Sequence, residues 1–276
     1  MRSILSLPAC LAALVALAPV AHAQRQTQAT PRSEADRWLS DCRDNHWSDD
    51  ERFCEVRNYT LPATKSLRVD GRENGGVHVY AWDSNSIQVV AKVEGRGDSQ
   101  AEAQASAKEI TIRAANGVVS ADGPRDRGRN GWAVSYSVFV PRSTDLSLTA
   151  RNGGIAVQGV SGRMDLETTN GGLTLADVNG DVRGTTVNGG LNVKLSGDRW
   201  QGAGLDVRTT NGGLRLDVPE HYSAQLETST VNGGMNVDFP ITVQGRLGRK
   251  LATQLGEGGP TLRLSTINGG LSIRRR

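Results

Sequence analysis

The chain has 276 residues, and its 32 Lys and Arg against 29 Asp and Glu leave a formal net charge of +3. The basic residues do not cluster except at residues 274–276, so nucleic acid is not expected as a partner. Beyond the first residues, no stretch approaches the roughly 20 consecutive apolar residues that a membrane-spanning helix needs, so no transmembrane segment is expected.

The first residues have the layout of a secretory signal peptide. Arg2 gives a positive start, residues 11–20 are apolar, and Ala21-His22-Ala23 fits the small-x-small pattern that precedes a cleavage site. We therefore expect a signal peptide at residues 1–23 and a mature chain that begins at Gln24. The chain should be exported, to the periplasm or to the extracellular side of the cell surface.

Two cysteines, Cys42 and Cys54, remain after the signal peptide. In an exported chain they are expected to form a disulfide, which would contribute about 3 kcal/mol at most because its loop is short. The residues around them include His46, Asp41, Asp44, Asp49 and Asp50. No second His or Cys pair offers metal-ligand spacing there, so a solvated acidic turn is favoured, and we expect no metal and no cofactor.

Residues 24–58 form a polar N-terminal segment with one short helix expected between residues 34 and 53. Residues 59–140 form a β-rich region with strands over residues 59–93 and 132–140. Within it, residues 98–108 are rich in Ala, Gln and Glu and predict one short helix, with Asp98 as its N-cap. We expect this region to cover one open end of the repeats that follow, because an uncapped end leaves strand edges unpaired.

The triplet Asn-Gly-Gly recurs along the chain and is the strongest signal in the sequence. It begins at Asn74, Asn152, Asn170, Asn188, Asn211, Asn232 and Asn268. From Asn152 to Asn232 the steps are 18, 18, 23 and 21 residues, a spacing typical of repeat architectures. We therefore assign residues 141–276 to repeats of about 20 residues, in which each triplet is a structural turn.

Apolar residues keep fixed places around each of these asparagines. Three and five residues after them stand Val77, Ile155, Leu173, Leu191, Leu214, Met235 and Leu271, and Val79, Val157, Leu175, Val193, Leu216, Val237 and Ile273. Six residues before the last six asparagines stand Leu146, Met164, Val182, Leu205, Leu226 and Leu262. The residues between these places are mostly polar, and such alternation turns one face of each strand into a core. Each repeat is therefore a strand, an Asn-Gly-Gly corner, a second strand and a second corner.

Two all-β architectures fit this pattern. Asn-Gly between alternating strands is also the strongest short signal for a hairpin, so an antiparallel meander stays open. The near-constant period favours a parallel, β-helix-like solenoid, with one coil per repeat stacked roughly 4.8 Å from the next. The residues two before the asparagines include Thr168, Thr186, Thr209, Thr230 and Thr266. A solenoid would place these threonines and the asparagines in hydrogen-bonded columns, for which a meander gives no reason.

Three short motifs carry a family resemblance: Val138-Phe139-Val140-Pro141, Leu146-Ser147-Leu148, and Asn152-Gly153-Gly154-Ile155 with its repeats. From about Tyr59 onward the chain resembles the bacterial putative-adhesin family, a group of secreted Gly-rich β-repeat proteins. Cys54-Glu55-Val56-Arg57 is similar to a lead-in found in some members. The resemblance implies a β-solenoid in the cell envelope, with adhesion suggested and sometimes a link to envelope stress. It brings no catalytic residues.

These patterns favour a non-enzymatic, exported cell-envelope protein that acts as an adhesin-like binding scaffold for an envelope protein or a glycan. The first alternative is a periplasmic envelope-stress or structural component that acts through a protein partner. The oligomeric state does not follow from the sequence. Trp200 and Tyr222, the aromatic residues within the repeats, are expected to be local packing residues.

The second alternative, a polysaccharide-active β-helix enzyme, would need carboxylates that converge on one groove. The acidic residues of the repeats instead occupy solvent-facing strand positions, namely Asp165, Glu167, Asp206, Asp217, Glu227 and Asp238. Arg183 and Arg263 interrupt the one column that three of them share. We therefore expect a mixed-charge solvated face and no catalytic residues.

Overall fold

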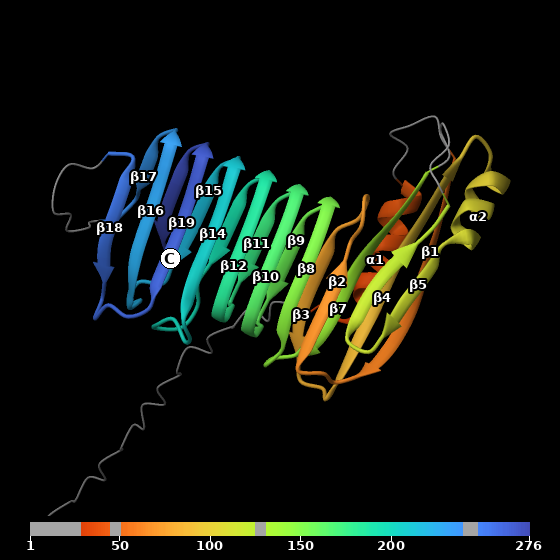
Figure 1. The fold of residues 1–276 in the computed structure, drawn as a ribbon, viewed down its shortest axis with the longest axis horizontal. Helices are drawn as coiled ribbons and strands as arrows, with labels where there is room; N and C mark the ends of the chain where they lie inside the picture. The colour runs from red at the N-terminus through yellow and green to blue at the C-terminus, as the bar shows by residue number, and fades with distance from the viewer. Residues whose placement is uncertain (1–28, 45–50, 125–130, 240–247) are drawn as a thin grey trace, which may run out of the picture.

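The computed structural model describes residues 29–44, 51–124, 131–239 and 248–276. The expected signal peptide and the turn around His46 lie outside these residues. In the described part, the strands form two ten-stranded sheets on either side of one apolar core (Figure 1). Two helices, α1 (Pro31–Asp44) and α2 (Gln100–Glu109), pack on the strands of the N-terminal half. The chain is therefore all-β with two short helices, one in the N-terminal segment and one in the β-rich region.

The two sheets, here called sheet A and sheet B, each take one strand from every repeat and are extended by strands of the N-terminal region. In spatial order, sheet A contains β1 (Glu51–Pro62), β4 (Ser86–Gly97), β7 (Trp132–Pro141), β3 (Val77–Trp82), β9 (Ile155–Gln158), β11 (Leu173–Ala176), β13 (Leu191–Lys194), β15 (Leu214–Val218), β20 (Leu271–Arg275) and β17 (Met235–Val237). Sheet B contains β18 (Lys250–Leu255), β16 (Ala224–Asn232), β19 (Thr261–Asn268), β14 (Gly204–Asn211), β12 (Asn179–Asn188), β10 (Ser161–Asn170), β8 (Asp145–Asn152), β2 (Ser66–Asp70), β6 (Val118–Asp122) and β5 (Thr111–Ala115).

Each Asn-Gly-Gly triplet connects a strand of sheet B to a strand of sheet A, so that one repeat makes one coil. In sheet B, β10 pairs in parallel with β8 and β12, and Asn170 lies opposite Asn152 and Asn188. In sheet A, β11 pairs in parallel with β9 and β13. A meander would pair successive strands antiparallel, so the parallel, solenoid-like arrangement is confirmed and the meander alternative is wrong.

The core lies between the sheets and is built from the apolar positions that the alternation predicts. The residues three and five after the asparagines, and those six before them, are at most 3% exposed in the coils from Asn152 to Asn211 and in the Asn268 coil. In the Asn232 coil, Met235 and Val237 are only half-buried. The reason is that β17 is the edge strand of sheet A and pairs with β20 on one side only.

A column of asparagine side chains runs along the whole stack. Each Nδ2 donates to the Oδ1 of the asparagine in the neighbouring coil, at 2.8 to 3.2 Å. The donor–acceptor pairs are Asn152–Asn74, Asn170–Asn152, Asn188–Asn170, Asn211–Asn188, Asn268–Asn211 and Asn232–Asn268. These bonds form the predicted asparagine ladder.

The threonines two residues before the asparagines also stack in register, but they do not bond to one another. Each is buried, and its Oγ1 donates to the carbonyl of a glycine in the adjacent coil, for example Thr186 to Gly171 at 2.8 Å. The threonines form the predicted column, but the prediction that they bond to one another is wrong. A buried hydroxyl needs an acceptor, and the corner of the neighbouring coil supplies a backbone carbonyl that the stacking leaves within reach.

The first glycine of each triplet is required by the distance between coils rather than by its φ angle. A Cβ built on Gly189 would lie 2.0 Å from the carbonyl oxygen of Gly171 in the next coil. The second glycine, Gly190, has its nearest such neighbour at 3.4 Å. At the second corners, positive φ occurs at Gly159, Gly180 and Gly197, and also at Asp177.

The coils stack in chain order except at the C-terminal end. Strand β19 lies between β14 and β16, and β20 lies between β15 and β17, so the Asn268 coil sits between the Asn211 and Asn232 coils. Strand β18 then pairs antiparallel with β16 at the outer edge of sheet B. The arginines at 274–276 lie at the end of this interior coil, where the Arg275 guanidinium lies 4.6 Å from the Phe239 ring centroid.

The solenoid begins with the Asn74 coil, although the intervening chain separates this coil from the next repeat. Strand β2 pairs with β8 and strand β3 with β9, both in parallel. The sheets continue beyond this coil into β7, β4 and β1 and into β6 and β5. Helix α2 packs on β4 and β1 and adds Ala107 to the core at this end. Its N-cap is Ser99, whose Oγ accepts from the Glu102 amide, and not Asp98.

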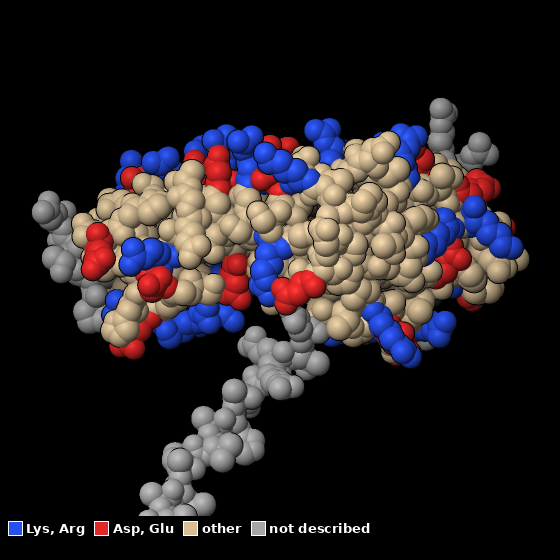
Figure 2. All heavy atoms as spheres, turned by 90° about the horizontal axis from the view of Figure 1, so that it is seen from below, with Lys and Arg blue, Asp and Glu red and all other residues tan. Residues whose placement is uncertain are grey.

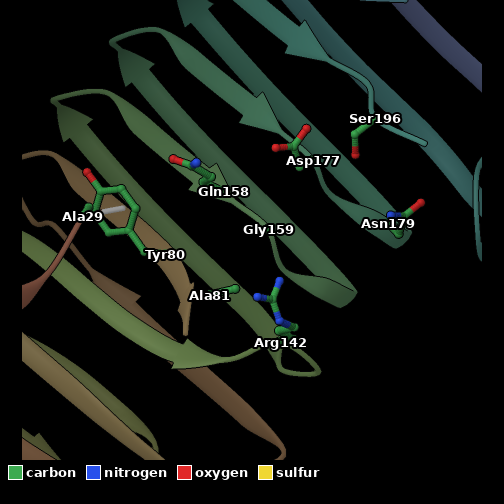
Figure 3. A pocket seen from close by; sticks show the side chains of 9 residues that line it. All are labelled: Ala29, Tyr80, Ala81, Arg142, Gln158, Gly159, Asp177, Asn179 and Ser196. Atoms are coloured by element: carbon green, nitrogen blue, oxygen red, sulfur yellow. The ribbon is translucent and has the colours of Figure 1, made fainter. Parts of the chain in front are cut away.

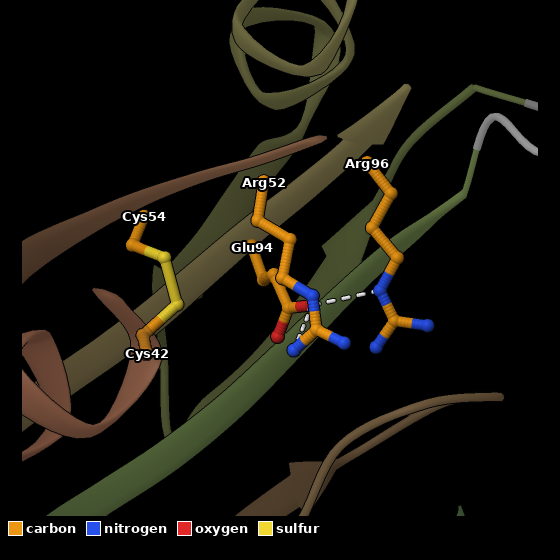
Figure 4. Close-up of a disulfide and its surroundings, with 5 residues drawn as sticks. All are labelled: Cys42, Arg52, Cys54, Glu94 and Arg96. Carbon is orange, nitrogen blue, oxygen red and sulfur yellow. Dashed lines mark hydrogen bonds and ion pairs between the residues drawn. A yellow bond between two sulfur atoms is a disulfide. The ribbon is translucent and has the colours of Figure 1, made fainter. Parts of the chain in front are cut away.

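Helix α1 lies on the outer face of sheet A, against β1, β4 and β7. The predicted disulfide is present: Cys42 of α1 is bonded to Cys54 of β1, with 6.4 Å between their Cα atoms (Figure 4). Because β1 starts at Glu51, the expected boundary at residues 58–59 falls inside this strand. The disulfide therefore fastens the end of α1 to the β-rich region.

A buried ion pair holds the other end of α1. Glu34 is 3% exposed, and its Oε2 accepts from Lys92 Nζ at 3.1 Å and from Ser137 Oγ at 2.8 Å. Burial raises the pKa of the Glu34 carboxyl, but the Ser137 hydrogen bond and the positive charge of Lys92 outweigh it and lower the pKa overall. Glu34 is therefore held as a carboxylate under the helix.

Replacing Asn188 by Ala is expected to destabilise the stack by about 1 kcal/mol per lost bond, because Asn188 both donates to Asn170 and accepts from Asn211. Asn232, at the end of the ladder, makes the one ladder bond to Asn268, so Asn232→Ala is the matched control. Urea unfolding of both variants measures the difference. Asn188→Ala should lose about twice as much stability as Asn232→Ala. An equal loss in the two would show that stability does not scale with the number of ladder bonds.

Removing the disulfide, by Cys42→Ser together with Cys54→Ser, is expected to lower the free energy needed to detach α1 from sheet A by up to about 3 kcal/mol. The asparagine-bearing coils should be unaffected, since none of their pairing involves α1. Hydrogen exchange resolved by peptide would show faster exchange in residues 31–44 and unchanged exchange in β10 and β12. Equal acceleration in those strands would contradict this division.

Acid is expected to loosen the same helix. A carboxyl whose pKa is lower in the folded state than in the unfolded state stabilises the fold at a pH above its unfolded-state pKa. This stability is lost as the pH falls through the folded-state pKa. Exchange in residues 31–44 should therefore accelerate as the pH drops below the ordinary Glu value of 4.5. In Glu34→Gln this acid-dependent step should be missing, after correction for intrinsic exchange rates.

Candidate functional site

A polar groove of about 370 Å³ opens beside the ends of the first coils and is the candidate binding site. Its lining includes Tyr80 and Ala81 of β3, Gln158 and Gly159 at the end of β9, Asp177, Asn179 and Ser196 at the second corners, and Arg142 and Ala29 (Figure 3). These residues come from four successive coils and the start of the described chain. Parallel stacking brings them together, because equivalent corners of adjacent coils lie side by side.

The corner backbone fixes several of these side chains. Asp177 has a φ of 54°, and its amide donates to the Lys194 carbonyl at 3.0 Å. The side-chain oxygen of Asn179 accepts from the Gln201 amide at 3.0 Å, which orients that side chain. Gly159 has a φ of 74°, and a Cβ there would lie 3.2 Å from the Cβ of Ala81. The groove floor is therefore set by backbone geometry and close packing.

The charges of the groove are balanced. Arg142 donates from Nε to Asp83 at 3.0 Å, and Asp177 lies 4.0 Å from the guanidinium of Arg276. Amide, hydroxyl, carboxylate and guanidinium groups thus offer both donors and acceptors without an excess of either sign. Such a lining suits a neutral polar ligand better than a strongly charged one.

Tyr80 forms the aromatic wall of the groove. Its ring stacks on Phe139 with 5.1 Å between centroids, and Trp82 packs on the same Phe139 at 5.8 Å. Burial is the main reason that the Tyr80 pKa is raised to about 12, so its hydroxyl stays protonated at neutral pH. The sequence reasoning missed this residue. Tyr80 and Gln158 stand six residues after Asn74 and Asn152 and pair directly in the sheet, and that shared offset was the available signal.

The acidic residues that argue against an enzyme lie on the outer faces of the sheets, as predicted, and several are bound to arginines. Arg208 donates to both carboxylate oxygens of Asp206, at 3.0 and 2.8 Å. Arg263 donates twice to Glu227, at 2.9 and 2.8 Å. Figure 2 shows charged side chains of both signs along the long margins of the molecule, and a largely uncharged area on the half that holds the N-terminal strands. These outer faces are mixed-charge surfaces.

A second hollow of about 310 Å³ lies on sheet B at the starts of β12, β14 and β19. Its lining includes Gly204, Asp181, Arg183, Asp206 and Arg263. Both lining carboxylates lie against arginines, Asp206 against Arg208 and Asp181 against Arg183. Within the described ranges, no group of three His, Cys, Asp or Glu side chains is placed to hold a metal ion.

Trp200 and Tyr222 are packing residues, as predicted. They are 2% and 3% exposed, and Trp200 Nε1 donates to the Gly180 carbonyl at 3.0 Å. They therefore add no aromatic surface to the repeats. Neither described helix is long and apolar enough to span a bilayer.

A family model described as Toastrack DUF4097 matches residues 64–274, which include every Asn-Gly-Gly coil. The chain belongs to this family. Its boundaries agree with the fold, since residue 64 precedes β2, the first strand of the Asn74 coil. The resemblance to secreted Gly-rich β-repeat proteins is thereby confirmed for the Toastrack part of the chain. No curated protein matches the sequence.

Several solved structures are similar to this Toastrack chain. A putative cell adhesion protein from Clostridium sporogenes ATCC 15579 has 10% identity and a TM-score of 0.44, covering 82% of this chain and 100% of the other. A putative adhesin from Bacteroides fragilis NCTC 9343 has 7% identity and a TM-score of 0.37, covering 81% and 97%. A putative lipid binding protein from Parabacteroides distasonis ATCC 8503 has 8% identity and a TM-score of 0.33, covering 81% and 96%. At these scores the likeness carries no argument about function.

Proposed function

We propose that this Toastrack protein is a non-enzymatic, exported binding scaffold of the cell envelope, with the groove beside Tyr80 as its ligand site and a neutral glycan chain as its ligand. The observation that carries the proposal is the groove itself, which joins corner residues of successive coils to one aromatic wall. Several of its residues are held by backbone geometry, so a ligand would meet a largely preformed surface and little conformational freedom would be lost on binding.

The lining supports a glycan through its chemistry. Sugar hydroxyls both donate and accept hydrogen bonds, and Gln158, Asn179 and Ser196 can do the same from neighbouring corners. The ring of Tyr80 offers an apolar surface to the less polar parts of a sugar ring, and its hydroxyl adds a polar group at the end of that surface. The balanced charge of Arg142 and Asp177 disfavours a strongly anionic or cationic ligand.

A non-enzymatic role is supported by the placement of the acidic residues. Hydrolysis of a glycan would need two carboxyl groups on opposite sides of the scissile bond. Among the described residues, the groove lining holds one carboxylate, that of Asp177, and the carboxylates of Asp206 and Glu227 lie on the outer face of sheet B. The scaffold would therefore hold a ligand and leave it intact.

A second candidate role is a periplasmic component that acts through a protein partner, with the mixed-charge outer faces as its contact surface. The two roles predict different locations. We would fractionate the native host and add protease to intact cells. Degradation of the protein would support an adhesin-like role at the surface. Protection inside the periplasm would overturn that role, and crosslinking would then be used to find the envelope partner.

The ligand site is tested by binding of the mature chain to an array of neutral and charged glycans. Gln158→Ala and Asp177→Asn are the test variants, and Asn at 177 tolerates the left-handed backbone of that corner. Arg208→Ala on sheet B is the matched control, because it removes a surface side chain remote from the groove lining. Loss of binding in the test variants with retention in the control is the expected result. Wild-type chain that binds no neutral glycan would overturn the glycan proposal.

A further inference from the structure

The Asn268 coil is the one coil in the described stack whose position departs from chain order. Its strands form hydrogen-bonded ladders on both sides: β19 with β14 and β16, and β20 with β15 and β17. Without it, the Asn211 and Asn232 coils would be left with a gap one coil wide. We call this gap, with its flanking strands, the acceptor slot.

The acceptor slot has acidic residues on both of its sides and in both sheets. In sheet B, Asp206 of β14 and Glu227 of β16 both lie opposite Arg263. In sheet A, Asp217 of β15 lies opposite Arg274, and the Asp238 carboxylate accepts from the Arg275 amide at 3.0 Å. The slot is therefore lined by four carboxylates and by two arginines of its own walls, Arg208 and Arg215, which bind Asp206 and Asp217.

The coil that fills the slot has the opposite charge. Residues 261–276 contain four arginines and no acidic residue. The Arg263 guanidinium binds Glu227 at 2.8 Å and lies 3.8 Å from Asp206, so one cation bridges both walls of the slot. In spatial order the outer column of sheet B becomes Asp165, Arg183, Asp206, Arg263 and Glu227, with alternating signs.

The charge pattern explains why the slot does not close on itself. The Asn211 and Asn232 coils have equivalent registers, since both align with the Asn268 coil residue by residue. Direct stacking would therefore place Asp206 opposite Glu227 and Asp217 opposite Asp238. Like charges directly opposite each other destabilise a sheet pair. A basic coil between them removes both clashes.

The connection to the inserted coil is suited to reopening. Residues 256–260 join β18 to β19 and have the sequence Gly-Glu-Gly-Gly-Pro. All three glycines have positive φ, at 52°, 77° and 138°. Short hinge loops favour exchange of the element that follows them. Three glycines let this hinge adopt an extended path as readily as the tight one.

We propose that the acceptor slot is a coil-binding site that takes a basic Asn-Gly-Gly coil, either from its own chain or from a second copy of this chain. Two copies then associate by reciprocal exchange of β19 and β20. Every strand pairing and ion pair of the slot is kept, because the same residues form them between the two chains.

The test uses two full-length variants with one added cysteine each, Arg208→Cys and Ser265→Cys. These residues face each other in the pairing of β14 with β19, so a disulfide between them reports occupation of the slot. The double variant should form this bond within one chain. When the two single variants are unfolded in urea and refolded together, a bond between chains is expected, and its yield should rise with protein concentration.

The matched control is a mixture of Glu167→Cys and Thr185→Cys chains, whose positions face each other in β10 and β12, two coils in chain order. It should give no more dimer than each variant alone. Adding Arg263→Glu to the Ser265→Cys chain should abolish the bond between chains, and Asp206→Lys with Glu227→Lys in the Arg208→Cys chain should restore it. Absence of the bond between chains, while the double variant forms its own, would overturn the proposal. If Arg263→Glu left the yield of the disulfide between chains unchanged, the claim that charge selects the coil for the slot would be wrong.

Discussion

Leu175→Asp is expected to unfold the chain at room temperature. Leu175 has no exposed surface and lies between the sheets, with Val157 and Val193 opposite it in the neighbouring coils. The substitution removes a buried side chain and places an unpaired carboxylate in the core, at an expected cost of about 5 kcal/mol or more. That is comparable with the whole stability of a typical domain, roughly 5–15 kcal/mol.

Circular dichroism and urea unfolding would measure this effect, with Thr174→Asp as the matched control. Thr174 is the preceding residue of β11 and is exposed on the outer face of sheet A. The same charge there should change stability by about 0.5 kcal/mol or less. Unfolding transitions that coincide for the two variants would refute the assignment of Leu175 to the core.

Gly189→Ala is expected to be the second most disruptive of these changes, although it adds a single methyl group at a surface corner. The new Cβ would lie 2.0 Å from the Gly171 carbonyl oxygen and 2.4 Å from its carbonyl carbon. Backbone atoms cannot rotate away as a side chain can, so the coils must separate locally. Overpacking of this kind costs about 3 kcal/mol, and here it would also strain the Asn188 ladder bonds and the Thr186 bond to Gly171.

Gly190→Ala is its control, since the Cβ would meet the Gly213 carbonyl at 3.4 Å, an ordinary contact. Both variants lose the same glycine flexibility in the unfolded chain, so their difference isolates the packing between coils. Thermal unfolding should show a much lower melting temperature for Gly189→Ala than for Gly190→Ala. Similar melting temperatures would mean that the stack can widen at one corner with little cost.

These two predictions bear on function because the proposed ligand site is part of the stack. Gln158, Asp177 and Ser196 reach the groove from corners whose spacing is set by the ladders and by the close approach of the glycines. A variant that opens the stack should therefore weaken ligand binding even when it lies far from the groove. Binding and stability would need to be measured on the same preparations.

The sequence by itself determined the strands, the corners and the core face of each coil. These properties depend on short-range chemistry: alternation decides which side chains of Leu173-Thr174-Leu175 point inward, and glycines allow the tight corners. The column of asparagines also followed from a fixed offset within each repeat. The pairing of Cys42 with Cys54 was available because two cysteines remained after the expected signal peptide.

Only the tertiary structure decided which coil pairs with which. The Asn211 and Asn232 coils align with the Asn268 coil in the same register, so the apolar and Asn-Gly-Gly pattern at Asn268 does not decide which coils flank it. The choice depends on charges that meet only after stacking, such as Arg263 between Asp206 and Glu227. The docking of α1 on sheet A and the placement of Tyr80 and Asp177 along one groove are also decided by the tertiary structure. They depend on contacts between segments far apart in the chain, and no local pattern records those contacts.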